Sequence, residues 1–364
     1  MAKVKSKKIS FCITCMNRLH HVQKTLPKNI EDNYLPDDVE FVLLDYNSKD
    51  GLEQWVQQNM QSYIDVGILN YYKTMDSEYY LRSHSRNMAF RLASGEILCN
   101  LDADNFLGEG FAVEMIKEFA QQSTIFYTSD FSSADAFGRV CVLQKDFLAI
   151  HGYNEAFAGY GYEDNDLFAR LKKHQLKHLQ YYNKSFNNAI KHPKLERINN
   201  ESIHNELFAA YISYIDPFAS EILFLYNDLS FKSIVLNDIG HADLIKNPSG
   251  ELKQSLGILS TFLTKDPKIG VWRKGKTEYQ VALQYNHEEV QVDMKLSVFN
   301  IGDKNFYKIE DNDFLISVIC ASNTAINEWI SIQMINSGKV VNPNGFGKGV
   351  VYKNLNNLEP ISLK

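Results

Sequence analysis

Residues 97–104 read Ile97-Leu98-Cys99-Asn100-Leu101-Asp102-Ala103-Asp104, an apolar run that ends in two carboxylates. Alternate residues of an extended segment point the same way, so both carboxylates face one spot just beyond the strand. Open α/β sheets keep their ligands at that edge. Two hard oxygen ligands suit Mn²⁺ or Mg²⁺, with a diphosphate completing the coordination shell. The stretch therefore predicts a metal and diphosphate site on an α/β sheet; a solvated acidic turn is the alternative.

The first half of the chain alternates expected strands with expected helices. Apolar runs predict strands at 9–14, 40–44, 68–73 and 97–101, and helical spacing predicts helices at 20–29, 52–60 and 85–94. The first helix is expected to be interrupted near Pro27. This alternation implies a mostly parallel sheet with helices on both faces. No glycine-rich phosphate loop follows these strands, so a metal would have to hold a diphosphate.

The composition is that of an ordinary chain with a mild negative charge. Its 364 residues are 45% hydrophobic and 23% charged, enough for two domains or one large domain with an appendage. The net charge of −6 argues against a nucleic-acid binder. The five scattered cysteines predict buried, reduced thiols.

The same sequence predicts a cytoplasmic protein. No apolar stretch approaches the roughly 20 residues of a membrane span, and no signal-peptide core follows Met1. A basic N-terminus of Lys3, Lys5, Lys7 and Lys8 would allow peripheral contact with the inner face of a membrane. A solvated tail is the alternative.

Four motifs in the first half resemble, in their order, the GT-A glycosyltransferases of the large family 2 type. They are Ile13-Thr14-Cys15-Met16-Asn17-Arg18, Leu43-Leu44-Asp45-Tyr46-Asn47-Ser48-Lys49-Asp50, Ser85-Arg86-Asn87-Met88-Ala89 and Leu101-Asp102-Ala103-Asp104. The family's second motif usually reads Val-Asp-Asp-Gly-Ser-Thr-Asp, so Tyr46 and Asn47 depart from it. The resemblance implies a GT-A fold, a UDP-sugar donor and a Mn²⁺ (or Mg²⁺) cofactor.

A later segment resembles the carboxyl-terminal catalytic segment of the β-1,4-galactosyltransferases. It comprises Gly138-Arg139-Val140 to Lys145-Asp146-Phe147-Leu148, Gly152-Tyr153-Asn154-Glu155 and Gly159-Tyr160-Gly161-Tyr162-Glu163-Asp164-Asn165-Asp166. That family reads Gly-Trp-Gly-Gly-Glu-Asp-Asp-Asp in the last motif, from which Tyr160, Tyr162 and Asn165 depart. The two resemblances together cover residues 9–195.

The resemblance implies a donor site made of Thr14, Asn17, Arg18, Asp45, Arg86 and Asp102. The counterpart of Asp45 in the family accepts a hydrogen bond from the uracil imide; the alternative is an acid that opens an Asx turn. Arg86 is expected to begin a helix, where the macrodipole disfavours a cation. An anionic ligand would explain it, and a solvated surface arginine is the alternative. Asp102 is expected to contact the ribose or a metal-bound water.

Asp104 and His192 are the expected direct metal ligands, with Asp102 beside them. The histidine comes from the resemblance, because galactosyltransferase-like families carry a metal-binding histidine at about this distance beyond their Glu-Asp. The alternative is an ordinary core or surface histidine.

Asp164 is, by its position in the last motif, the expected catalytic base of an inverting transfer, in which a carboxylate deprotonates the acceptor hydroxyl. Glu163 is expected to hydrogen-bond a sugar hydroxyl, and Tyr160 and Tyr162 to stack on a sugar ring. A structural alternative exists, because the dipole of a helix stabilises acids in its first turn.

Beyond residue 195 the patterns carry less information. Residues 201–214 and 217–228 predict helices, and short alternating runs at 279–283, 290–294 and 350–352 predict strands. We therefore expect a GT-A catalytic domain with a helical extension over 1–240 and a β-rich accessory domain over 241–364. Glycan binding, homo-oligomer formation and support of the catalytic domain are the open roles of the second domain.

The sequence thus predicts an inverting, metal-dependent glycosyltransferase that moves a hexose or N-acetylhexosamine from a UDP-sugar to a glycan or glycolipid acceptor. A retaining transferase on the same fold is the nearest alternative, because a fold alone does not fix stereochemistry. A nucleotidyltransferase is disfavoured, since its glycine- and arginine-rich phosphate loop is missing. A catalytically silent glycan-binding or assembly protein is the alternative from a different class.

Overall fold

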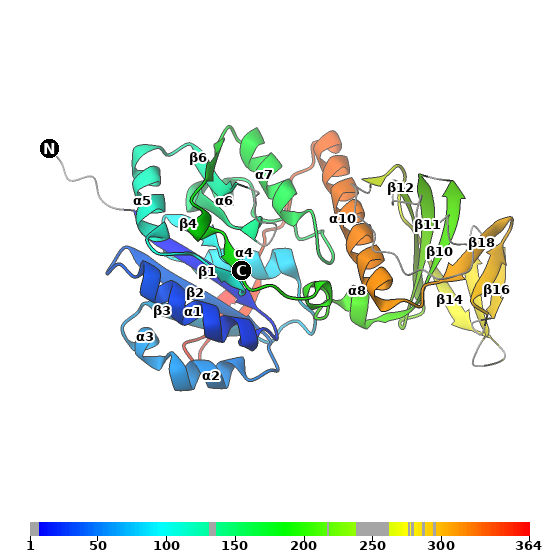
Figure 1. Cartoon of the computed structure of the whole chain (residues 1–364), viewed down its shortest axis with the longest axis horizontal. Helices are drawn as coiled ribbons and strands as arrows, with labels where there is room; N and C mark the ends of the chain where they lie inside the picture. Colours follow the sequence, from blue (N-terminus) through cyan, green and yellow to red (C-terminus); the bar gives the residue numbers. More distant parts are fainter. Residues whose placement is uncertain are drawn as a thin grey trace. The chain divides into compact units, whose positions relative to one another are not determined.

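The computed structural model describes residues 7–130, 136–216, 218–237, 262–275, 277, 280–285, 288–293 and 296–364. The chain divides into two compact units (Figure 1). The first comprises Met1–Phe157, Glu163–His192 and Gly338–Lys364, and the second comprises Ala158–Tyr162 and Pro193–Ser337. This division differs from the expected boundary at residue 240, because the second unit includes Ala158–Tyr162 and resumes at Pro193, and because the last 27 residues return to the first unit.

A nine-stranded sheet forms the centre of the first unit. Its order is β20-β19-β3-β2-β1-β4-β7-β6-β8. The strands are β1 (Ile9–Cys15), β2 (Val39–Tyr46), β3 (Leu69–Thr74), β4 (Ile97–Asn100), β6 (Ile125–Ser129), β7 (Val140–Leu143), β8 (Lys177–Tyr181), β19 (Gly349–Lys353) and β20 (Pro360–Leu363). Strands β3, β2, β1 and β4 are parallel, whereas β7 runs antiparallel to β4 and β6. The α/β class and the parallel core are confirmed.

Helices cover both faces of this sheet. One face packs against α1 (Leu19–Asn33), α2 (Leu52–Asn59), α3 (Gln61–Asp65) and α5 (Phe111–Gln121), and the other packs against α4 (Arg82–Leu92), α6 (Gln144–Ala149) and α7 (Glu163–Lys173). Each fully buried leucine or phenylalanine of these layers contributes roughly 1.5–3 kcal/mol. Pro27 lies inside α1, which continues to Asn33, so the expected interruption there is wrong. Packing of Val22, Leu26 and Ile30 on the core overrides the propensity of one proline.

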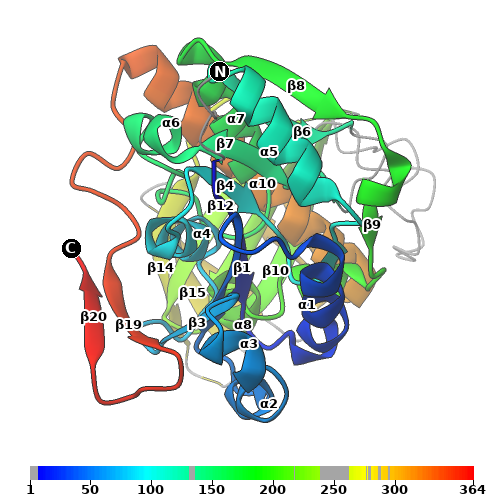
Figure 2. The same cartoon turned by 90° about the vertical axis from the view of Figure 1, so that its left-hand side faces the viewer.

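The end of the chain completes the sheet at its β3 edge. Strand β19 pairs antiparallel with β3, with Tyr352 opposite Lys73, and β20 pairs with β19. Figure 2 shows these last two strands, in red, beside β3. The strand expected at 350–352 is therefore real, but it belongs to the first unit and not to an appendage.

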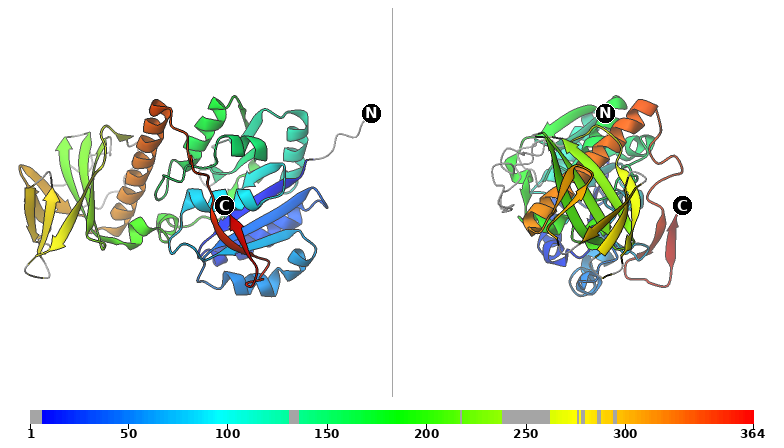
Figure 3. Two further views of the ribbon diagram at one scale, coloured as in Figure 1. Left: turned by 180° about the vertical axis from the view of Figure 1, so that it is seen from behind. Right: turned by 90° about the vertical axis from the view of Figure 1, so that its right-hand side faces the viewer.

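The second unit is built on antiparallel strands in the order β16-β15-β14-β12-β11-β10-β18-β17, with β13 on β12. The strands are β10 (Leu207–Asp216), β11 (Ala219–Tyr226), β12 (Ser230–Asn237), β13 (Phe262–Leu263), β14 (Lys268–Lys274), β15 (Gln280–Tyr285), β16 (Glu288–Asp293), β17 (Val298–Ile301) and β18 (Lys304–Lys308). The helices described in this unit are η3 (Lys194–Arg197), α8 (Ser202–Asn205) and α10 (Asn312–Ser337). Figure 3 shows α10 in orange. The expected β-rich region is confirmed.

Two expected helices of this region are wrong. Residues 201–214 and 217–228 form mainly β10 and β11, whose side chains enter two hydrophobic clusters, one on each side of the sheet. A strand buried on both faces gives a continuous apolar run that periodicity does not separate from a buried helix. Pro217, Lys3, Lys5, Tyr279 and Met294 lie outside the described residues.

Helix α10 was missed by sequence reasoning. Its 26 residues make it, among the described helices, the one long and apolar enough to cross a membrane by length and composition. The expectation that no stretch approaches that length is therefore wrong. In the structure 67% of its apolar window is buried inside the protein, as in the core helix of a globular unit.

Candidate active site

Asp104 and His192 lie against each other beyond the carboxyl end of β4. The distance between Asp104 Oδ2 and His192 Nε2 is 2.9 Å, and both side chains are largely buried. Two short strands, β5 (Asn105–Phe106) and β9 (Asn188–Ala189), pair and hold the two segments together. The Ile190 amide also donates to the Asp104 carbonyl over 2.8 Å. The structure thus joins two expected metal ligands that are 88 positions apart in sequence.

This pair fits a divalent cation. Two neighbouring ligands of an octahedral ion lie about 3 Å apart when each is about 2.1 Å from the metal. The separation of 2.9 Å between Asp104 and His192 matches that spacing. Burial raises the pKa of Asp104, but the hydrogen bond and charge of His192 outweigh burial and lower that pKa overall. The carboxylate is therefore ionised at neutral pH, as a metal ligand must be.

A buried arginine joins the other expected acids. Arg86 Nη2 donates to Asp102 Oδ1 over 3.0 Å, and Arg86 Nη1 donates to Asp164 Oδ1 over 2.9 Å. Glu163 Oε1 lies 3.5 Å from the same Nη1. Three carboxylates to which the sequence assigns three different roles therefore share one guanidinium.

The position of Arg86 differs from the expected one. Helix α4 begins at Arg82, so Arg86 lies in the second turn and not at the helix start. Burial lowers the pKa of Arg86, but the carboxylates of Asp164 and Asp102 outweigh burial and raise it. Because carboxylates of the protein neutralise this arginine, its charge needs no further anion. Its expected contact with a diphosphate stays a prediction.

Asp164 has a raised pKa. Burial raises its pKa to about 7; Glu163 and Asp102 act in the same direction, whereas Arg86 opposes them. Asp164 follows Glu163 at the start of α7, and Glu163 is only 4% exposed. A carboxyl group that titrates near neutral pH is suited to take a proton from a hydroxyl and to release it again.

Gly138 is a neighbour whose role sequence reasoning missed. A Cβ at this position would lie 2.9 Å from Asp164 Oδ2 and 3.2 Å from Arg86 Nη2. Asn100 Nδ2 donates to the Gly138 carbonyl over 3.0 Å and to Asp102 over 3.1 Å. The one signal in the sequence is that Gly138 begins a galactosyltransferase-like motif. A glycine has no side chain that would indicate a chemical role.

Asp45 has the contacts of a turn acid. Its side chain is fully buried, Oδ1 accepts from the Ser48 amide over 2.7 Å, and Oδ2 accepts from the Tyr71 hydroxyl over 2.8 Å. Burial raises the pKa of Asp45, although the two hydrogen bonds act against it. These contacts are those of the alternative interpretation, the Asx turn. The expected contact with a nucleobase stays a prediction.

The other expected donor-binding residues lie at the end of β1. Thr14 Oγ1 shares a hydrogen bond of 2.6 Å with the Tyr80 hydroxyl. Asn17 has φ 55°, and its Oδ1 accepts from the Lys49 amide over 2.6 Å. Arg18 directly precedes α1. The structure brings these residues to the same edge as Asp45, and their role toward a donor stays a prediction.

Tyr160 and Tyr162 belong to the second unit. The Tyr160 hydroxyl accepts from Arg197 Nη1 over 2.8 Å, and the Arg197 guanidinium lies 5.3 Å from the centroid of the Tyr160 ring. Tyr162 has φ 70° beside Gly161 with φ 116°, which gives this loop a left-handed backbone. Stacking of these rings on a sugar stays a prediction.

Residues 124–198 match the model of a family described as the N-terminal domain of galactosyltransferase. This segment is galactosyltransferase-like. It contains Glu163, Asp164 and His192, three of the site residues named from the sequence. The resemblance that the motif at 159–166 indicates is therefore confirmed over this part of the chain.

Several solved structures show partial similarity. The mannosyltransferase PcManGT from Pyrobaculum calidifontis, in complex with GDP-Man and Mn²⁺, is 16% identical, with 49% of this chain and 55% of that chain covered and a TM-score of 0.42. GalNAc-T7 with UDP, GalNAc and Mn²⁺ is 13% identical, with 48% and 42% covered and a TM-score of 0.42. A Drosophila β-1,4-galactosyltransferase 7 mutant with manganese, UDP-Gal and xylobiose is 13% identical, with 53% and 74% covered and a TM-score of 0.36.

The chain spans about half the length of the first two of these proteins. Among curated proteins, none matches its sequence.

Proposed function

We propose that this protein is an inverting, metal-dependent GT-A glycosyltransferase that moves a hexose or N-acetylhexosamine from a UDP-sugar to a glycan or glycolipid acceptor. The observation that carries the proposal is the Asp164 carboxyl, largely buried and held by Arg86 within the galactosyltransferase-like segment. Its desolvation raises its pKa to about 7. The Asp104–His192 pair supplies a cation site in the same unit.

Asp104 and His192 would hold Mn²⁺. Asp102, two residues before Asp104, would lie near the ion. A bound divalent cation neutralises diphosphate charge and so stabilises the nucleotide as a leaving group. Neither common glycine-rich phosphate loop occurs in the sequence, which makes such a cation necessary for holding a diphosphate.

Asp164 would act as the general base. As the acceptor oxygen forms its bond to the anomeric carbon, the bond from that carbon to the diphosphate oxygen breaks, and the acceptor proton passes to the Asp164 carboxylate. Arg86 orients the carboxylate through a 2.9 Å hydrogen bond and keeps part of it ionised at neutral pH. Glu163 would accept a hydrogen bond from a sugar hydroxyl.

Proton NMR of the product tests the stereochemical part of the proposal. An α-linked UDP-sugar should yield a β-linked product, because a single displacement inverts the anomeric carbon. An α-linked product would contradict inversion and would favour the retaining alternative on the same fold.

A further inference from the structure

Arg139 is a fully buried cation close to the segment that contains Asp104. Its side chain is 1% exposed. Nη1 donates to the Phe186 carbonyl, and Nη2 donates to the Phe106 carbonyl over 3.0 Å. A buried guanidinium requires such bonds, because removing a charge from water is costly. Arg139 thereby connects β5, which contains Phe106, to η2 (Lys184–Phe186), which directly precedes β9.

Arg139 also sets the direction of the Asn105 side-chain amide. Arg139 Nη2 donates to Asn105 Oδ1 over 2.9 Å. A guanidinium has donors and no acceptor, so Asn105 must turn its oxygen, and not its nitrogen, toward Arg139. The amide nitrogen then points the other way. Asn105 is 1% exposed, so both ends of its amide depend on partners within the protein.

The nitrogen of this amide holds the Asp104 carboxylate. Asn105 Nδ2 donates to Asp104 Oδ1 over 3.0 Å, while Asp104 Oδ2 lies 2.9 Å from His192 Nε2. A carboxylate is planar, so holding one oxygen also orients the other. The bond from Asn105 therefore leaves Oδ2 as the oxygen of Asp104 that faces His192.

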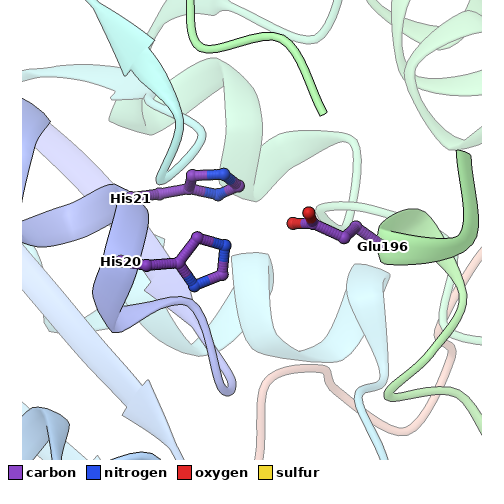
Figure 4. Close-up of side chains that lie close together, drawn as sticks. All are labelled: His20, His21 and Glu196. Atoms are coloured by element: carbon purple, nitrogen blue, oxygen red, sulfur yellow. The ribbon is translucent and has the colours of Figure 1, made fainter. Parts of the chain in front are cut away.

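The backbone of Asn105 is held from two sides. Its amide donates to the Asp102 carbonyl over 2.9 Å, and its carbonyl accepts from Asn29 Nδ2 of α1 over 2.9 Å. Figure 4 shows the first turn of the same helix, which carries His20 and His21. A residue that orients a ligand needs such support, because a loosely held partner does not fix the ligand's geometry.

We propose that Asn105 is a positioning residue of the cation site, which directs Asp104 Oδ2 toward the ion, and that Arg139 sets the direction of its amide. The proposal rests on the proposed function, because it takes the Asp104–His192 pair as a cation site. Carboxylates that ligate a metal are themselves hydrogen-bonded, and loss of such a partner typically weakens metal binding about 10–100-fold.

Mn²⁺ binding to the full-length protein tests this without turnover. The free-ion electron paramagnetic resonance signal is titrated with each variant. Asn105→Ala and Asn105→Leu should each weaken Mn²⁺ binding by at least about tenfold. Leucine fills the space of the amide, so a loss shared by both variants comes from the missing donor and not from a cavity. At saturating Mn²⁺, pulsed measurements should still detect nitrogen coupling from His192, because the ligands themselves are unchanged.

Asn33→Ala and Asn33→Leu are the matched controls. Asn33 is a second buried asparagine, 3% exposed, that donates to the Gly108 carbonyl and accepts from the Ala112 amide, each over 2.9 Å. These variants also lose a buried amide, and they should lose thermal stability but bind Mn²⁺ as the native protein does. An equal loss of affinity at both positions would overturn the proposal, because the effect would then be a general loosening of the fold.

Arg139→Lys keeps the positive charge but has no planar fork of donors, so it should also weaken Mn²⁺ binding. Native affinity in this variant would overturn the part assigned to Arg139.

Native affinity in Asn105→Ala, with binding lost in Asp104→Ala, would overturn the role of Asn105 and leave the cation site standing. Native affinity in Asp104→Ala and in His192→Gln as well would instead overturn the cation site of the proposed function.

Discussion

Raising the pH from 6 to 8 is expected to increase kcat/KM about tenfold, because Asp164 must be ionised to accept a proton. With a pKa of about 7, its ionised fraction rises from about 0.1 at pH 6 to about 0.9 at pH 8. Activity should therefore climb with pH and level off above about pH 8. The assay is the initial rate of UDP release at low donor concentration, with Mn²⁺ saturating at every pH.

Asp164→Asn should remove this acidic limb. The amide keeps the size and much of the hydrogen bonding of the carboxyl group but accepts no proton, so kcat should fall by about 10²–10⁴. Folding gives a second readout. Because the pKa of Asp164 is raised, its ionisation costs stability as pH rises from its ordinary value of 3.8 toward 7. The variant should thus have a Tm at pH 8 equal to or above the native one.

Arg86→Gln supplies the opposite perturbation. The guanidinium opposes the rise in the pKa of Asp164, so its removal should move the acidic limb to higher pH. A limb that stays in place in Arg86→Gln, or one that persists in Asp164→Asn, would refute the assignment of the titration to Asp164.

Three further changes have defined outcomes. Gly138→Ala places a methyl group 2.9 Å from Asp164 Oδ2, so kcat should fall and urea unfolding should show a loss of about 1–3 kcal/mol; native kcat would contradict this close approach. Asp45→Ala leaves an amide and a hydroxyl unpaired and should cost about 1–3 kcal/mol of stability; if Asp45 is a turn acid, calorimetric UDP affinity stays unchanged, and a loss of affinity would restore the nucleobase role. Glu221→Ala removes a fully buried carboxylate that accepts from Ser233, Tyr285 and the partly exposed Lys304; two hydroxyls lose their partner, so the second unit should be destabilised by about 1–3 kcal/mol, and thermal unfolding equal to that of the native protein would refute this.

The buried Glu221 also predicts an acid dependence of the second unit. Burial raises the pKa of Glu221, but hydrogen bonds from Lys304, Ser233 and Tyr285 outweigh burial and lower it overall. A carboxylate with a lowered pKa stabilises the fold above its ordinary value of 4.5, and this contribution is lost as pH falls below that value.

Much of the first unit could be predicted from the sequence, because its strands are buried and its helices are amphipathic. The strands expected near residues 9, 40, 68 and 97 correspond to β1, β2, β3 and β4. Strands β7 and β8 lie within residues 124–198, the segment that matches the galactosyltransferase model. The pairing of β19 with β3 was beyond sequence reasoning, since more than 270 residues separate the paired positions.

The second unit was less predictable for a physical reason. Both β10 and α10 are apolar around most of their surface, so neither shows the alternation or the stripe that distinguishes a strand from a helix. An element that is buried on all sides has no polar face, so its sequence lacks the hydrophobic periodicity that reveals a strand or a helix. This burial results from packing against distant parts of the chain, which the sequence of one segment does not show.

For the candidate site, the sequence predicted which residues take part, but not which of them contact one another. The motifs named Asp104, His192 and Asp164, and the structure joins the first two. The link from Arg86 to Asp164 crosses 78 positions, and no spacing rule predicts it. Thr25 and Asn29 of α1 donate to the backbone of the turn that contains Asp104, a contact that only the structure shows.

The release of UDP from UDP-sugars in the presence of Mn²⁺ tests the central claim most directly. We expect at least one UDP-hexose or UDP-N-acetylhexosamine to be hydrolysed by the native protein, with no release in excess EDTA and greatly reduced release by Asp164→Asn. Full activity in EDTA, or native rates in Asp164→Asn, would contradict a metal-dependent transferase that uses Asp164 as its base.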